Sequence, residues 1–503
     1  MVILGVGLAF GRASADALFL SRYGAEYLPV IYIMFAPLLA AVSIIYAALV
    51  DYLPSEKFFK VILIFLMFCV VISWLLITKT NNTIIYPVYY IINKIASELL
   101  LVHGSLYLVH NYNTIQAKRL FPIIFTGEQL GFVLGGFLVS ISTSIIDIDG
   151  LPLIWILFMA IGVIQLHLWH KIKGASPYYQ KQKKSGSRIK SVIQSVYQGL
   201  KFSRESLLLR NASFALFFLV IIYYILSYST NRIFVESFKN EQDLAEFLGL
   251  LTAGTSIITL TIQLFITNRI INHYGIKKLN LVFPLITASA ASALLISFTL
   301  TFAVLVSVVR DSLLNSLQNP LRIIFLNALP GYMQGRAGAV SIALVMPLAL
   351  LVCGILLWVF QGMEHVAYFL IPCLLLALAF LYYSHKMNQT YTKTLTTHLK
   401  EHLYLPETDS SNIELDEESI NSFQEIFEEL PQARTITVSL LAKHSPEKSI
   451  EFLIPKLDNI AISDVDVYLN SLFRNSNHLL SYETLKQIPV KDQHLQSTLL
   501  QLL

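Results

Sequence analysis

Long apolar stretches separated by short polar breaks fill the first 388 residues of the chain. Twelve of them come near or above the roughly 18–20 residues that a helix needs to cross a bilayer. They lie near 1–21, 27–50, 58–78, 84–110, 120–146, 151–170, 212–236, 245–267, 278–298, 301–328, 337–360 and 366–386. Because backbone groups in lipid must be satisfied within the segment, helices are the expected element. The pattern predicts an all-α polytopic membrane protein with twelve transmembrane helices.

Composition supports the same class of protein. The 503 residues are 55% hydrophobic and 14% charged, whereas soluble domains carry about 25% charged residues. The three cysteines lie in apolar segments and form no CxxC motif, and the chain contains no GxSxG, HExxH or Walker A sequence. We therefore expect neither an enzyme, nor a metal or cofactor site, nor a nucleic-acid partner.

A polar break at 171–210 divides the apolar region into two parts, 1–170 and 211–388, of six predicted helices each. The break holds ten Lys or Arg residues, as expected of a cytoplasmic linker. With the N-terminus inside, the linker and inner loops carry eighteen basic residues and the outer loops only three, Arg22, Lys79 and Lys239. The positive-inside rule then places both termini in the cytoplasm, and we expect a bacterial inner membrane.

The two halves resemble each other at an offset of 218 residues. This register sets Gln116 on Gln334, Lys118 on Arg336, Gly136 on Gly354 and Lys60 on Lys278. Two six-helix halves in the same orientation are the layout of transporters of the major facilitator type. Their substrate site lies near the midplane, between the halves.

Residues 389–503 have a different composition, polar with aliphatic positions at helical spacing. Pro431, Pro446, Pro455 and Pro489 punctuate this segment. The pattern predicts a cytoplasmic α-helical tail of HEAT-like character, to which a partner protein could bind.

Ionisable residues inside the predicted helices are the main candidates for function, because each costs roughly 2.5–3.5 kcal/mol at mid-bilayer. Three pairs have a spacing of four, which puts both partners on one helix face: Arg12 and Asp16, Lys94 and Glu98, Arg232 and Glu236. Span 10 adds Arg310, Asp311 and Gln318, and span 5 adds Glu128. Such pairs either hold helices together or line a water-filled site that binds a polar substrate or relays protons. Their recurrence in spans 1, 4 and 7 favours the second interpretation.

Two further features of the spans are interpreted as structural. His103 lies five residues from Glu98, on another side of the helix, and is expected in the core. Gly131, Gly135 and Gly136 form a small-residue face typical of close helix packing.

Four segments resemble the ATP/ADP antiporters of plastids and intracellular bacteria. They are "DALFLSRYGAEYLP" (16–29), "ASELLLVHGSLYLVHNYNTIQAKRLFP" (96–122), "RIFVESFK" (232–239) and "SLLNSLQNPLRIIFLNALPGYMQGRAGA" (312–339). The resemblance covers roughly residues 10–360. It implies a major-facilitator-like fold and nucleotide exchange that depends on two membrane glutamates, matched here by Glu98 and Glu236.

The chain departs from the pattern of that family at its lysines. Ala15 stands where the family has the first-helix lysine, and Gln318 and Asn319 stand where it has a lysine and a glutamate. Lys94 is an addition. In a cavity lined by all the charged candidates, four basic side chains then face five acidic ones. Such a cavity suits a zwitterion or a weakly charged solute better than ATP, which is nearly a tetra-anion.

The sequence thus predicts a secondary-active transporter that works by alternating access on a small-molecule substrate, a nucleotide or a less anionic metabolite. Arg12, Asp16, Lys94, Glu98, Arg232, Glu236, Arg310 and Gln318 are its predicted substrate-binding or coupling residues. The alternative is a membrane-anchored scaffold or sensor that moves no solute and binds a partner protein through its tail.

Overall fold

The computed structural model describes residues 1–50, 54–80, 82–111, 114–173, 197–204, 206–329, 337–361 and 369–404. The central part of the basic linker and the predicted HEAT-like segment beyond residue 404 lie outside the described residues. The chain divides into two compact units, Met1–His398 and Leu399–Leu503, where the sequence predicts a boundary near 388. The described residues are all helical or loop.

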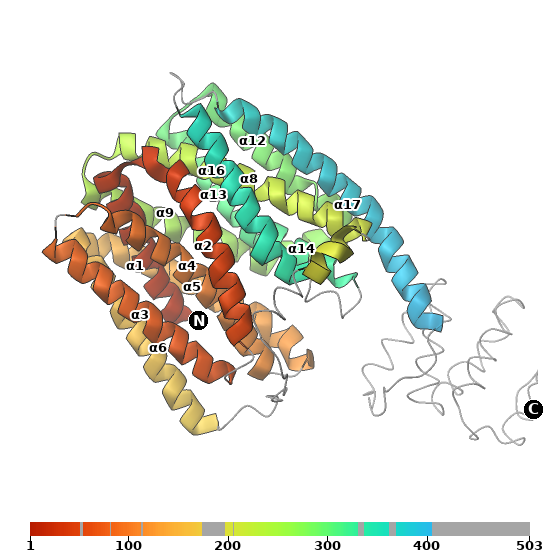
Figure 1. The fold of residues 1–503 in the computed structure, drawn as a ribbon, viewed down its shortest axis with the longest axis horizontal. Coiled ribbons are helices and arrows are strands. Elements are labelled where there is room, and N and C mark those ends of the chain that lie inside the picture. The colour runs from red at the N-terminus through yellow and green to blue at the C-terminus, as the bar shows by residue number, and fades with distance from the viewer. Residues whose placement is uncertain are drawn as a thin grey trace, which may run out of the picture. The chain divides into compact units, whose positions relative to one another are not determined.

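The predicted first half contains α1 to α6 (Figure 1). The helices up to α6 and those from α8 onward are called the first and second half below. The bounds in the first half are α1 Val2–Phe19, α2 Leu28–Leu49, α3 Ser55–Lys79, α4 Ile85–Asn111, α5 Thr114–Thr143 and α6 Leu151–Lys173. A π-helical turn η1 (Leu20–Gly24) and a 3-10 turn η2 (Ala25–Tyr27) join α1 to α2, and the 3-10 turn η3 (Ile148–Gly150) precedes α6. Gly24 has φ 115°, a left-handed value that favours glycine, and it lets the chain reverse between α1 and α2.

The second half begins at α8. Its helices are α8 Leu207–Ser237, α9 Glu241–Thr261, α10 Thr267–Tyr274, α11 Ile276–Leu279, α12 Val282–Ile296, α13 Leu300–Leu313, α14 Asn319–Asn327, α16 Met346–Phe360 and α17 Leu370–Tyr404. Three π-helical segments interrupt it: η4 Ile262–Ile266, η5 Leu314–Gln318 and η6 Ser341–Val345. Within the predicted linker 171–210, α6 continues to Lys173, residues 197–204 are helical and α8 starts at Leu207. The Ser206 hydroxyl caps α8 by accepting from the backbone N–H of Leu209.

Ten helical stretches of the described residues are long and apolar enough to cross a membrane. The first, Val2–Leu49, contains both α1 and α2, because the turns η1 and η2 fill the reversal between them without a non-helical residue. α5 is not among the ten, although it runs over 30 residues. These stretches identify a multi-pass membrane protein.

Small residues bring the two halves into backbone contact at two places. α5 packs on α9, where a Cβ added to Gly136 would meet the Gly249 carbonyl oxygen and the Ala253 backbone nitrogen. α2 packs on α16, side by side in Figure 1, where a Cβ on Gly354 would meet the Pro29 carbonyl oxygen at 2.8 Å. Gly136 and Gly354, which the offset of 218 residues superposes, thus make equivalent contacts between the halves.

The same small-residue face of α5 also holds α1. A Cβ on Gly131 would lie 2.8 Å from the Gly5 Cα, and a Cβ on Gly135 would lie 2.9 Å from the Val6 backbone. The predicted role of these glycines in close helix packing is confirmed. Because α1 is held against α5 along this face, its polar residues are directed toward α4 and α13.

Candidate functional site

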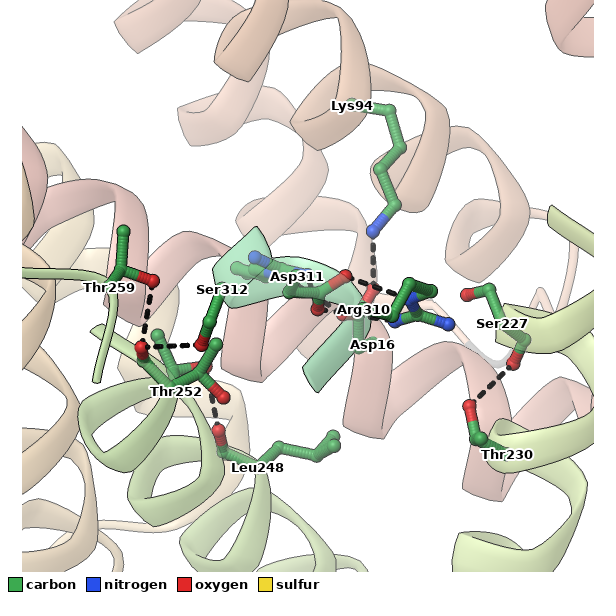
Figure 2. Close-up of polar contacts among 12 residues, drawn as sticks. Asp16, Lys94, Ser227, Thr230, Leu248, Thr252, Thr259, Arg310, Asp311 and Ser312 are labelled. Carbon is green, nitrogen blue, oxygen red and sulfur yellow. Dashed lines mark hydrogen bonds and ion pairs between the residues drawn. The ribbon is translucent and has the colours of Figure 1, made fainter. Parts of the chain in front are cut away.

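Five charged side chains meet where α1, α4 and α13 come together. Arg12 and Asp16 come from α1, Lys94 from α4, and Arg310 and Asp311 from α13. Figure 2 shows Lys94 extending from its helix toward Asp16, with Arg310 and Asp311 beside it. α1 and α4 belong to the first half and α13 to the second, so this five-charge network joins the two halves within the membrane-spanning region.

The network is a chain of alternating charges with two short links and two long ones. The Lys94 Nζ donates to Asp16 Oδ1 at 2.9 Å. Arg310 donates to both Asp311 oxygens, at 2.8 Å from Nε and 3.1 Å from a terminal nitrogen. Arg12 lies between these two pairs, 3.9 Å from Asp16 Oδ2 and 3.9 Å from Asp311 Oδ2. The network therefore consists of two tight ion pairs and one loosely held arginine.

Aromatic rings support the two tightly held cations. The Lys94 ammonium lies 4.6 Å from the centre of the Tyr90 ring, and the Arg310 guanidinium lies 4.5 Å from the centre of the Tyr223 ring. Contacts of this kind stabilise a desolvated cation by about 1–2 kcal/mol. Lys94 and Arg310 therefore each have a carboxylate and an aromatic ring as partners.

Arg12 differs from the other two cations in its access to water. Its side chain is 42% exposed, compared with 25% for Lys94 and 5% for Arg310. It is nevertheless densely surrounded by protein, and it contacts a carboxylate of the opposite half. Arg12 is therefore the most exposed cation of the network, and it contacts carboxylates of both halves.

Glu98 lies one helical turn from Lys94 but does not form the predicted ion pair with it, because Asp16 of α1 takes the ammonium. The Glu98 side chain is exposed, although protein surrounds it closely. The positive charge that acts on it is that of Arg322, on α14 of the second half. Among the described residues, the buried Arg322 Nε has no hydrogen-bond partner.

The pair Arg232 and Glu236 forms as predicted, at 3.8 Å, but it lies apart from the network. Glu236 stands one residue before the end of α8 and is 61% exposed. Spacing along a helix does not fix depth in the bundle, so the roles of Arg232 and Glu236 in substrate binding stay predictions. Ala15, at the position of the missing lysine, is fully buried in the core.

Gln318 and the π-helical segment η5 lie directly after the network along the chain. Gln318 is 4% exposed, and its Oε1 has no hydrogen-bond partner among the described residues. Single π-helical turns are frequent at functional sites, because they shift the side chains that follow. The sequence gives no sign of η5, nor of the roles of Tyr90, Tyr223 and Arg322.

A second set of contacts closes one end of the bundle, the end formed by η1, η3 and the start of α9. This is the predicted outer end. Arg22 donates to both oxygens of Glu241 at 2.7 Å, and a terminal nitrogen lies 2.8 Å from Asp149. Nearby, Gln242 donates to Asp147 at 3.1 Å. Since Glu241 and Gln242 belong to the second half, this Arg22 latch ties the halves together.

Two sequence interpretations concern residues outside the network. His103 is fully buried, with Nδ1 3.0 Å from the Tyr46 hydroxyl and Nε2 2.8 Å from the Ser55 carbonyl oxygen, so it is a core histidine as expected. Glu128 is 8% exposed on α5, where that helix packs on α1. The described residues contain no group of His, Cys, Asp or Glu that could hold a metal ion.

Comparison with known proteins shows the fold. A POT family transporter in complex with 5-aminolevulinic acid superposes with a TM-score of 0.57 at 12% identity, covering 77% of this chain and 95% of that one. A POT family transporter in complex with a thioalcohol-conjugated peptide gives the same values. The chain has a major-facilitator-like fold. The inward-open xylose transporter XylE from E. coli superposes at 0.49 with 14% identity, over 82% of this chain and 96% of that one. No family model and no curated protein matches the sequence.

Proposed function

We propose that this protein is a secondary-active solute transporter that works by alternating access, with the five-charge network as its substrate site. The observation that carries the proposal is that the network joins α1 and α4 to α13 across the two halves. Substrate sites of this fold class lie between the halves near the bilayer midplane. A purely structural clamp would use fully paired charges, whereas Arg12 is loosely held and accessible.

Alternating access requires contacts between the halves that can open on each side in turn. The Arg22 latch supplies such contacts at the predicted outer end, because it is polar and partly exposed. Arg22, Asp149 and Glu241 are 24%, 33% and 30% exposed. Water can therefore replace its hydrogen bonds when the end opens, and the glycine contacts of α5 and α2 provide smooth surfaces on which the halves can rock.

The finer features of the proposal rest on the sequence. They are twelve membrane helices in two halves, a basic linker, both termini in the cytoplasm of a bacterium, and kinship with the ATP/ADP antiporters. Glu98 is proposed as the coupling carboxylate, since it is exposed and one turn from Lys94. The network is made of three cations and two carboxylates, which favours a less anionic metabolite than ATP.

Uptake by proteoliposomes tests the proposal. The full chain is purified, reconstituted and screened with labelled nucleotides, nucleosides, amino acids, carboxylates and sugars, against empty liposomes. We expect saturable uptake of one class, lost in Lys94→Gln and retained in Arg232→Gln, which lies outside the network. No uptake of any class by folded protein would contradict a transport function.

The alternative, a scaffold that binds a partner through the 389–503 tail, predicts a different result. Loss of the tail would then abolish function while Lys94→Gln and Glu98→Gln would be harmless. Uptake that survives tail truncation and fails in the network variants would exclude it.

A further inference from the structure

Within the five-charge network, Arg12 is the cation for which the described residues offer no carboxylate closer than 3.9 Å. Lys94 has Asp16 at 2.9 Å, and Arg310 has both oxygens of Asp311 within 3.1 Å. These four charges cancel in two pairs. The remaining charge is that of Arg12, 3.9 Å from carboxylates that are already engaged.

Arg12 is also the member of the network that a solute can reach. Its side chain is the most exposed of the five, at 42%, and it lies between a carboxylate of α1 and a carboxylate of α13. The guanidinium of arginine offers a planar fork of donors that matches the two oxygens of a carboxylate. Beside it, one terminal nitrogen of Arg310 is buried without a hydrogen-bond partner among the described residues.

Glu98 and Arg322 do not change this balance. They are one negative and one positive charge, and the field of Arg322 is the one that acts on Glu98. With them included, the charges that the described residues contribute to the site still sum to one positive charge. The tyrosine rings of Tyr90 and Tyr223 add apolar surface next to the charges.

On this basis, and given the proposed transport function, we infer that the substrate is a small organic acid with one net negative charge, bound through its carboxylate to Arg12. A monocarboxylate neutralises the site. A phosphate monoester carries about −1.5 to −2 at pH 7, and ATP carries more, so each would leave uncompensated negative charge in a desolvated space at a cost of several kcal/mol. Neutral sugars would leave Arg12 without a counter-charge.

Arg12→Gln is a clean perturbation of this site, because Asp16 keeps Lys94 and Asp311 keeps Arg310. The substitution makes the network neutral without leaving an unpaired carboxylate. Arg12→Lys retains the charge but loses the planar fork. Arg232→Gln is the matched control, since Arg232 lies near the end of α8, outside the network.

The test measures thermal stabilisation of the purified full chain and uptake by proteoliposomes with the same probes. These are lactate and benzoate as monocarboxylates, succinate as a dianion, AMP and ATP, glycine as a zwitterion, and glucose. We expect lactate or benzoate to stabilise and enter. Arg12→Gln should weaken binding about 10–100-fold, as expected for loss of hydrogen bonds between charged groups. Arg12→Lys should be intermediate and Arg232→Gln unchanged.

The outcomes separate the inference from the proposed function. Uptake of a nucleotide, glycine or glucose with no binding of monocarboxylates would overturn the inference and leave transport standing. Monocarboxylate binding that is unchanged in Arg12→Gln would overturn the assignment of Arg12. Binding and uptake of none of the probes would overturn the inference, and failure of the wider uptake screen would then overturn the proposed function as well.

Discussion

Loss of the Arg22 latch should shift the protein toward a state that is open at the predicted outer end. In Arg22→Gln, Glu241 and Asp149 lose the guanidinium that lies 2.7 and 2.8 Å away. The carboxylates remain in contact with water, so the change should alter the equilibrium between states more than the folding of either half.

The magnitude follows from geometry and exposure. Exposed ion pairs contribute about 0.2–1 kcal/mol, and hydrogen bonds to charged groups contribute about 1.5–3 kcal/mol. The latch lies between these cases, because it is bidentate but each partner is a quarter to a third exposed. We therefore expect a loss of about 1–2 kcal/mol from the closed state, which raises the open population about 5–30-fold.

Alkylation of one introduced cysteine can report this shift. Ser227 is half-buried on α8 and lies near the network in Figure 2. In Ser227→Cys protein, a membrane-impermeant maleimide added from outside should react about 5–30-fold faster when Arg22→Gln is present. Protein with only the native Cys69, Cys353 and Cys373 gives the background rate. An unchanged rate in folded Arg22→Gln protein would refute the latch.

Three further predictions concern packing and charge. Gly136→Ala should lower the melting temperature in a thermal-shift assay, because its Cβ meets the α9 backbone, while Gly254→Ala should not, since a Cβ there meets nothing within 4 Å. Equal melting temperatures would contradict the close packing of α5 on α9. Asp16→Asn leaves Lys94 without its carboxylate and should destabilise by about 1–3 kcal/mol, measured by chemical denaturation against Glu236→Gln, for which little change is expected. The Glu98→Gln variant should retain the wild-type melting temperature and lose uptake. An unchanged uptake rate would contradict the proposed role of Glu98 as the coupling carboxylate.

Length and apolarity decide whether a segment can span a membrane, so the sequence alone predicts a helical multi-pass protein. Ten stretches of the described residues meet these criteria, and the number twelve stays a prediction. The sequence predicts the site less well. Lys94 and Glu98 share a helix face, but Lys94 pairs with Asp16 of α1 at 2.9 Å. Periodicity carries no information about neighbouring helices. The spacing of Arg232 and Glu236 along the chain also does not show that they lie near the end of α8.

Arg22 illustrates the same limit. In the sequence it is one of three basic residues in the predicted outer loops, and nothing near it indicates a partner. Glu241 is 219 residues away along the chain. Only the packing of η1 against the start of α9 brings the two together, so the latch follows from tertiary structure alone.

Uptake by two single variants tests the central claim, that solute crosses through the five-charge network between the halves. Asp311→Asn removes the α13 carboxylate that contacts Arg12 of α1 and pairs with the neighbouring Arg310, and Glu236→Gln removes an equally charged group outside the network. With the substrate found by the screen, proteoliposomes with equal amounts of folded protein should lose most uptake in Asp311→Asn and keep the wild-type rate in Glu236→Gln. Equal rates in the two variants would contradict the account.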